Sequence, residues 1–444
     1  MKNGICFILY FVLLLEINSN FLRFLADQNT FNYQTINAMS TNQNIIRTDY
    51  TATNSDQSVA YITGSNIEIN SANLNKTGGS SNLENSQSYG VNSAVLVNGG
   101  QVKVDISNIT TFAEGSNGVT CTNGGSMEIS RSTINTTSSS SRGLVSTYGG
   151  IIKGSNISIA TAGSSSSCLV NEKGDDNSII CQFCRLMSNG TTSPLIYSKG
   201  GNIQLTYLNG TSNTSQIAVL EGKSTLSFLG GTFIMVSGNG QTNEDNCGVF
   251  MYQSQGGDSD DRITLNCDSS HLGFLPNSNG YSSAPLFFVT NTKTTINLNQ
   301  CHFLYGSGTF LKASQNSHWG TLGENGAEVI LNLVNQNIEG DFVVDSNSEL
   351  TINMQNSTIK GKINSNRAAD DLKIVMDSNS EIELTGNSYY TSIENADKTG
   401  SNIKNGSYSL SRYDDSVSPI RDNSLILNHN LYKIFILLFL VILF

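Results

Sequence analysis

A repeat of about 25 residues constrains the fold of this chain more than any other feature. Short apolar runs begin 25, 25, 25 and 26 residues apart, at Ala94, Val119, Leu144, Leu169 and Leu195. Other positions keep the same spacing, among them Gly99, Gly124 and Gly149, and Ile109, Ile134 and Ile159. Because several separate columns align, the chain is built from stacked units of one design.

Each unit contains two or three stretches in which apolar and polar residues alternate, as in Val-Lys-Val-Asp-Ile at 102–106. Alternation of this kind predicts half-buried strands, and the Gly-Gly, Ser and Asn clusters between them predict turns. Such a unit has no helix and cannot bury its own apolar side chains, so it must stack on its neighbours. We therefore predict an all-β fold, a right-handed parallel β-helix, over residues 58–395.

The prediction places Ile109, Ile134 and Ile159 in one inward column. Two other repeat architectures fit less well, because the leucine-rich repeat pattern is absent and a propeller blade needs a longer unit. Later apolar runs, such as 217–220, 248–251 and 285–289, continue the repeat with longer insertions between them.

Composition agrees with a β-solenoid and excludes two other classes of protein. Only 13% of the residues are charged and 41 are glycine. Asn, Ser, Thr and Gly are poor residues for helix interiors, which argues against a helical protein. The net charge of −11 argues against a nucleic-acid partner, which requires a basic surface.

The two ends predict the location of the protein. Residues 1–26 read as a secretory signal peptide, with Lys2 followed by a short apolar run. Residues 27–57 are a polar lead-in or a cap for the first coil, and residues 396–424 a polar stalk. Residues 425–444 end in an apolar tail, which fits a GPI-attachment signal or a retained membrane anchor.

Lipid attachment at Asp422 or Asn423 follows from the GPI alternative, and we expect a protein anchored at the cell surface. Sequons for N-glycosylation fit the same secretory route. They begin at Asn75, Asn108, Asn135, Asn156, Asn189, Asn209, Asn213, Asn356 and Asn405.

Seven cysteines follow the signal peptide, and their scattered positions do not form a disulfide framework. Cys181 and Cys184 form an isolated Cys-x-x-Cys pair without further zinc ligands. We expect either a local disulfide or two free thiols there. His271, His302 and His318 have no nucleophile near them in the sequence and are expected to be packing or surface residues.

Two sets of residues are candidates for binding. Asp258, Asp260 and Asp261 offer three carboxylates in four residues, which hard cations such as Ca²⁺ prefer, although a solvated turn has the same composition. Calcium is the only cofactor for which we identify a candidate site. Aromatic residues that combine a ring with a polar tip suit a sugar-stacking platform; they are Tyr148, Tyr197, Tyr252, Tyr305 and Trp319.

Coil strings at 93–100, 142–150 and 285–292, with Trp319-Gly320 beyond them, resemble secreted and cell-surface parallel β-helix proteins. These include adhesin-like and autotransporter-passenger-like solenoids and, more distantly, the pectate-lyase superfamily. The resemblance implies a surface rod. Enzymes on this fold would also need a Ca²⁺ cage or paired carboxylates, and here the acids cluster in loops.

We therefore expect a non-catalytic adhesin or a carbohydrate- or matrix-binding module. Its partners would be an extracellular glycan or a surface protein, and the membrane through its C-terminal anchor. A polysaccharide lyase or glycoside hydrolase and a structural coat protein are the alternatives.

Overall fold

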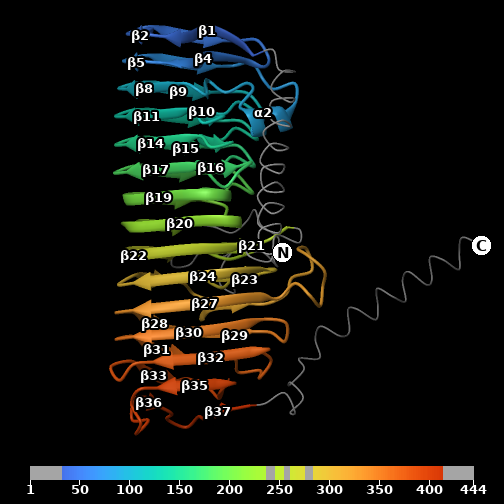
Figure 1. The fold of residues 1–444 in the computed structure, drawn as a ribbon, viewed down its shortest axis with the longest axis vertical. Coiled ribbons are helices and arrows are strands. Elements are labelled where there is room, and N and C mark those ends of the chain that lie inside the picture. The colour runs from blue at the N-terminus through green and yellow to red at the C-terminus, as the bar shows by residue number, and fades with distance from the viewer. Residues whose placement is uncertain (1–32, 237–245, 255–260, 276–283, 414–444) are drawn as a thin grey trace, which may run out of the picture.

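The computed structural model describes residues 33–236, 246–254, 261–275 and 284–413. They form a parallel β-helix, as predicted: an elongated stack of coils in which each strand pairs in parallel with the equivalent strand of the next coil (Figure 1). Each regular coil has three strands, which build three long faces that we name A, B and C.

Face A is the side of the coil that carries β7. It contains β1 (Gln34–Thr41), β4 (Gln57–Ser65), β7 (Val95–Asn98), β10 (Val119–Thr122), β13 (Leu144–Thr147), β16 (Leu169–Glu172), β21 (Val249–Tyr252), β23 (Phe287–Thr290), β26 (Thr309–Ala313), β29 (Asp341–Val344), β34 (Ser388–Tyr390) and β37 (Leu410–Arg412).

Face B is the sheet through β8. It contains β2 (Asn44–Ile46), β5 (Ile67–Asn70), β8 (Gln101–Asp105), β11 (Ser126–Ser130), β14 (Ile151–Ser155), β17 (Ser178–Gln182), β24 (Thr292–Asn299), β27 (Ala327–Val334), β30 (Glu349–Gln355), β32 (Asp371–Met376) and β35 (Ser392–Asn395).

Face C is the side of the coil that carries β9. It contains β3 (Asp49–Ala52), β6 (Asn73–Lys76), β9 (Asn108–Thr111), β12 (Thr133–Thr136), β15 (Ser158–Thr161), β18 (Arg185–Ser188), β25 (His302–Leu304), β28 (Asn337–Glu339), β31 (Thr358–Gly361), β33 (Glu381–Leu384) and β36 (Ile403–Lys404).

Three longer strands turn the corners without a break. β19 (Ile196–Ser212) and β20 (Ala218–Met235) contribute to all three faces, and β22 (Arg262–Phe274) contributes to faces B and C. Strands also lie outside the expected range of 58–395, because β1 begins at Gln34 and β37 ends at Arg412. The coil is therefore longer at both ends than the sequence pattern indicated.

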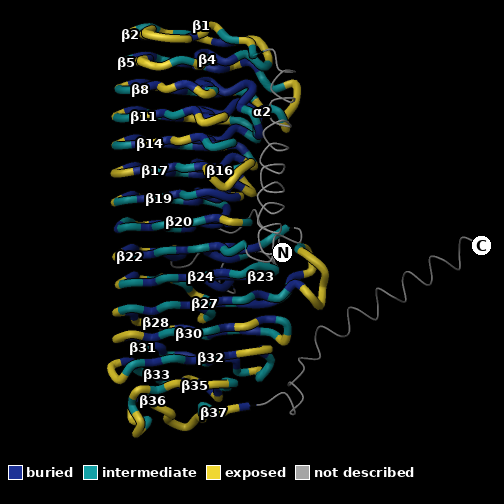
Figure 2. The backbone as a smooth tube through the Cα atoms, in the orientation of Figure 1, coloured by how far each residue is buried: buried dark blue, intermediate teal, exposed yellow. Residues whose placement is uncertain are grey.

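The inward columns form one continuous apolar core, and buried residues recur along the stack of coils (Figure 2). Ile109 pairs with Ile134, and Ile134 pairs with Ile159, in exact register. All three are buried, as predicted. Stacking like on like lets each coil bury side chains that it has no room to bury alone.

Polar columns hold the corners of the regular coils together. The backbone N–H groups of Ser116, Ser141 and Ser166 donate to the hydroxyls of Ser141, Ser166 and Ser193, over 3.1, 3.0 and 2.9 Å. At another corner Gly124 has a φ of 70°, a left-handed conformation that glycine adopts without steric cost. These corner contacts explain why the repeat keeps its length over several coils.

Within the described residues, one helix interrupts the all-β pattern. α2 (Leu83–Tyr89) begins after Asn82, whose side chain accepts the N–H of Asn85, and ends at Gly90 in the left-handed conformation. It lies beside the coils (Figure 1), where Tyr89 stacks on Tyr148 with ring centroids 5.5 Å apart. None of the described helices is long and apolar enough to cross a membrane.

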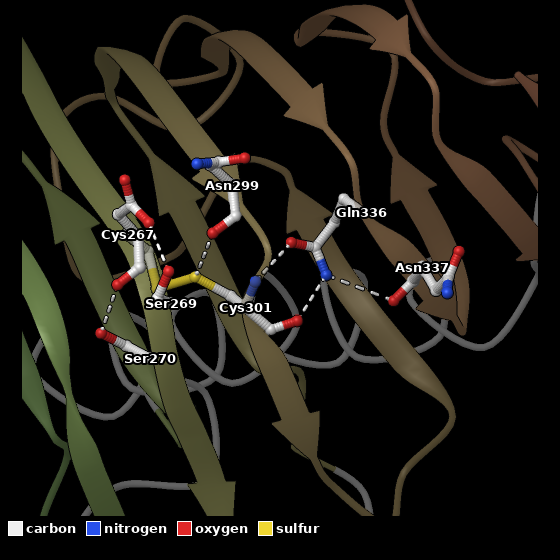
Figure 3. Close-up of a disulfide and its surroundings, with 8 residues drawn as sticks. Cys267, Ser269, Ser270, Asn299, Cys301, Gln336 and Asn337 are labelled. Carbon is white, nitrogen blue, oxygen red and sulfur yellow. Dashed lines mark hydrogen bonds between the residues drawn. A yellow bond between two sulfur atoms is a disulfide. The ribbon is translucent and has the colours of Figure 1, made fainter. Parts of the chain in front are cut away.

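A disulfide joins Cys267 in β22 to Cys301, just before β25 (Figure 3). It links two successive coils, with the two Cα atoms 6.6 Å apart. The Cys-x-x-Cys pair forms no disulfide, so of the two sequence-based alternatives the free thiols are correct, and both Cys181 and Cys184 are buried. Burial also raises the pKa of the free thiol of Cys168 to about 12.

Candidate functional site

Face A carries an outward column of large apolar residues, which is unusual for the solvent side of a coil. Tyr197, Val219, Phe250 and Phe288 occupy equivalent positions on four successive coils. They belong to a second apolar cluster, separate from the main core, to which Trp319 also contributes. The column continues with Val170 on one side and Lys312 on the other, so its aromatic rings, rather than apolar character alone, set this cluster apart.

The aromatic rings of this cluster stack on one another. Tyr252 lies 4.7 Å from Phe250 and 4.5 Å from Trp319, measured between ring centroids. The ammonium group of Lys312 lies 4.7 Å above the ring of Phe288, in the geometry of a cation–π contact. Trp319 belongs to the segment that follows β26, and its contact with Tyr252 packs this segment against the cluster.

A small pocket opens among these rings, with a volume of about 150 Å³. We call it the aromatic pocket. It is lined by Thr192, Pro194, Tyr197, Gln216, Val219, Phe250, Tyr252 and Trp319. The indole N–H of Trp319 is buried and has no hydrogen-bond partner among the described residues. The pocket thus combines ring faces with donors and acceptors at its rim.

The structure brings together three of the five aromatic residues that were predicted to form a platform. Tyr197, Tyr252 and Trp319 line the aromatic pocket. Tyr148 lies elsewhere and stacks on the helix residue Tyr89. Tyr305 lies outside this pocket too, because its hydroxyl donates to the carbonyl of Glu339 at face C. The platform is therefore smaller than expected.

A buried carboxylate lies beneath the rings. The side chain of Glu221 is only 3% exposed and pairs with the Lys199 ammonium at 3.2 Å. It also accepts the backbone N–H of Ser254 at 3.3 Å and the Tyr197 hydroxyl at 3.5 Å. Burial, together with the nearby carboxylates, raises the pKa of Tyr197 and of Tyr252 well above the usual value. Both phenols therefore remain protonated donors at physiological pH.

A second carboxylate on this face was also missed from the sequence. Glu172, at the end of β16, forms an ion pair with the largely buried guanidinium of Arg142. The alternation of residues along a strand could have predicted that both carboxylates point outward on face A. Glu172 and Glu221 each lie two residues after an outward position, and residues two apart on a strand share a side. Each carboxylate is held by a cation, which suits a structural or binding role better than proton transfer.

Most of the predicted calcium site lies outside the described residues. This applies to Asp258 and Asp260, whereas Asp261 immediately precedes β22. Among the residues that the structure covers, no three His, Cys, Asp or Glu side chains are grouped to hold a metal ion. The proposed signal peptide at 1–26, the tail at 425–444 and the attachment residues Asp422 and Asn423 likewise fall outside the described ranges.

The histidines occupy two places. His271 and His302 are exposed on adjacent strands of face C and stack with their ring centroids 4.8 Å apart. His318 is exposed next to Trp319. These positions agree with the expectation of surface residues.

All nine sequons are described, and all lie on face C or in the turns that bound it. Asn75, Asn108, Asn135 and Asn209 lie on strands of face C. The remaining five lie directly beside those strands, at Asn156, Asn189, Asn213, Asn356 and Asn405. Glycans at these positions would leave face A, and with it the aromatic pocket, uncovered.

Comparison with protein-family models, curated proteins and solved structures finds no match to this chain.

Proposed function

We propose that this protein is a non-catalytic binding module of the cell surface, and that its aromatic pocket takes a sugar ring of an extracellular glycan. The observation that carries the proposal is the clustering of Tyr197, Phe250, Tyr252 and Trp319 around one pocket on face A. Aromatic rings with polar tips suit recognition surfaces that are apolar on one side and wet on the other. A sugar ring has the complementary character, with C–H groups on its faces and hydroxyls around its edge.

Polar groups near the rings support the same ligand class. Thr192 and Gln216 lie at the pocket, and the hydroxyl of Tyr197 is protonated at physiological pH for the reason given above. These groups can exchange hydrogen bonds with sugar hydroxyls, each with a net contribution of about 1 kcal/mol. The stacked rings would provide most of the affinity.

A polar ladder on face B supports the role of an extended surface rod. The side-chain amides of Asn297, Asn332 and Asn353 donate in turn to Asn266, Asn297 and Asn332 over 2.8, 2.7 and 2.8 Å. Each side-chain amide donates one N–H to its neighbour, and its second N–H can donate to a ligand outside the ladder. Repetition at the strand spacing of about 4.8 Å stiffens the rod and gives it a polar surface.

The cell-surface part of the proposal depends on the signal and tail sequences at 1–26 and 425–444 and on the sequons. Treatment of intact cells with a phosphatidylinositol-specific phospholipase tests it. Release of the protein supports a GPI anchor, whereas retention on the membrane supports a retained apolar anchor.

A glycan array probed with the full-length protein tests the binding function. We expect saturable binding to one class of glycan, and at least about a tenfold loss of affinity in Trp319→Ala, because central aromatic residues dominate binding energies. Tyr148→Ala is the matched control, since this aromatic residue lies outside the pocket, and it should bind as the wild type does.

Three outcomes would count against this function. An array that stays empty for both acidic and neutral glycans would exclude it. New chain ends in a polysaccharide incubated with the protein and Ca²⁺ would favour a lyase or hydrolase. Self-association of the protein without any ligand would favour a coat protein.

A further inference from the structure

Between β25 and β28, face C contains a break that faces A and B do not share at the same step. At the same step of the coil, β26 pairs with β29 on face A and β24 pairs with β27 on face B. On face C, β25 pairs with β22 on one side only, and β28 begins a separate sheet with β31, β33 and β36. In the described part of the chain, two strand edges therefore face each other without a ladder between them.

Side chains span this break at both of its ends. The Gln336 carboxamide accepts the N–H of Cys301 at 2.9 Å and donates to its carbonyl at 2.6 Å, and Figure 3 shows it reaching across. At the other end, the Tyr305 hydroxyl donates to the carbonyl of Glu339. At the equivalent corner of the regular coils, the shorter hydroxyl of Ser132 accepts the N–H of Ser107 between strands that pair in register. The longer glutamine side chain in the same role fits a separation wider than one ladder step.

A groove with a volume of about 570 Å³ runs along the break. It is lined by residues of both edges and extends past β28 to Thr358 and Lys360 on β31 and Glu383 on β33. Three residues of extended chain occupy about 10 Å of length, 4.8 Å of sheet width and 10 Å of depth, or roughly 480 Å³. Only part of the groove lies between the two edges, so its volume is an upper bound on the space there, and this bound exceeds the volume of one short strand. Phe303 agrees with this, because it holds an inward position on β25 but is only half-buried.

The register across the break predicts which side chains would flank an inserted strand. The N–H of Gln300 donates to the carbonyl of Val334 at 3.4 Å. In a parallel pair, an N–H that bonds to the carbonyl of one residue lies opposite the following residue, so Gln300 lies opposite Asn335. Continuing from there, His302 faces Asn337, Phe303 faces Ile338, and Leu304 faces Glu339. The central pair is apolar and points inward, whereas Glu339 is exposed and forms no ion pair with any described residue.

We propose that this groove binds an extended peptide, which inserts as a parallel strand between β25 and β28. Its central residue would be apolar and β-branched, to pack between Phe303 and Ile338. The next residue would be basic, opposite Glu339. Unpaired strand edges are templates for the addition of a strand, in which backbone hydrogen bonds provide affinity and alternate side chains provide specificity.

Fluorescence anisotropy with three labelled peptides and the full-length protein tests the proposal. The first peptide is Ser-Thr-Ile-Lys-Ser. The second carries an N-methylated Ile, which removes a ladder donor, and the third has Glu in place of Lys. We expect saturable binding of the first peptide and at least about a tenfold weaker binding of each of the other two.

The variant Glu339→Lys reverses the expected preference. It should bind the Glu peptide better than the Lys peptide, because the cross-strand charge pair is exchanged. The side chain of Glu339 is exposed, so the substitution leaves the core unchanged. The variant Trp319→Ala should bind all three peptides as the wild type does, which separates this proposal from glycan binding at face A.

The proposal is overturned if the Lys peptide shows no saturable binding, or if the N-methylated peptide binds equally well. It is also overturned if Glu339→Lys leaves the order of the peptides unchanged. Loss of glycan binding in Glu339→Lys with no peptide binding in the wild type would assign the groove to a glycan instead.

Discussion

The coils between β7 and β18 differ from those between β21 and β28 in their regularity and in the contacts that hold them. The first set repeats at about 25 residues and is held by columns of identical residues, such as Ile109, Ile134 and Ile159. The second set varies in length and carries most of the aromatic cluster, the disulfide and most of the groove. Both candidate binding sites therefore lie where the repeat is least regular.

The physical reason is that a strict repeat leaves little to distinguish one coil from the next. Identical columns satisfy the core and the corners, and they present similar surfaces at every level. An insertion changes the coil length and frees a segment, such as the one holding Trp319, to fold over a face. The regular coils provide the scaffold, and the irregular coils provide the specific surfaces.

The largest effect should follow from breaking a regular column. Ile134→Ala removes a fully buried side chain that contacts equivalent residues above and below it. We expect the free energy of unfolding to fall by about 2–5 kcal/mol, measured by denaturant unfolding followed by circular dichroism. Glu128→Ala, an exposed substitution in the same coil, is the control and should stay within about 0.5 kcal/mol. An equal loss in both variants would contradict the importance of the column.

A smaller, more local effect should follow from removing the disulfide of the irregular coils. Cys301→Ser opens a bridge between residues 34 positions apart, and we expect a loss of about 2–4 kcal/mol. Hydrogen exchange should accelerate in β22 and β25 and remain unchanged in β10 and β13. Equal acceleration of hydrogen exchange in all four strands would show that the disulfide does not stabilise the irregular coils more than the regular ones.

The smallest effect concerns Lys76, at the upper boundary of the regular coils. Its column continues with Thr111, Thr136 and Thr161, but Lys76 is fully buried. Its ammonium donates to the carbonyls of Asn54 and Gly78, and burial lowers its pKa to about 8. The variant Lys76→Thr extends the column of threonines by one coil and removes the amine that titrates.

The sign of the pH effect follows from the lowered pKa. Unfolded lysine titrates near 10.4, so between about pH 8 and 10.4 the unfolded chain binds more protons, and Lys76 makes the wild type more stable as the pH rises. From pH 8 to 9.5 the unfolding free energy of the wild type should rise relative to Lys76→Thr by about 1.5 kcal/mol. The other titrating groups are the same in both proteins, so their contributions cancel in the difference between the two unfolding free energies. A difference that stays constant over this range would contradict a lowered pKa.

Several elements were predictable because they depend on the repeat alone. The inward column of isoleucines and the glycine corners follow from spacing, because equivalent residues of equal-length coils must stack. α2 was missed, since its seven residues Leu83–Tyr89 are too few to show a helical period and depend on the caps Asn82 and Gly90. The Cys267–Cys301 bridge was missed because unequal coil lengths hide which cysteines lie above one another.

The aromatic site shows the same limit. Tyr197 and Tyr252 lie on face A strands, so their proximity depends on the register of coils of unequal length. Trp319 joins them from a segment with no strand pattern, and Tyr148 and Tyr305, which look equivalent in the sequence, do not. The position of the nine sequons around one face was also hidden, because a sequon by itself carries no information on its face.

By itself, the amino-acid sequence determined the architecture of this protein: the parallel coil, the length of its regular unit and the residues of its inner columns. These follow from periodicity, which is a local property repeated many times. The tertiary structure alone decided which faces carry the rings, the sequons and the broken ladder between β25 and β28. Those features depend on contacts between residues of different coils, and insertions of unequal length set which residues meet.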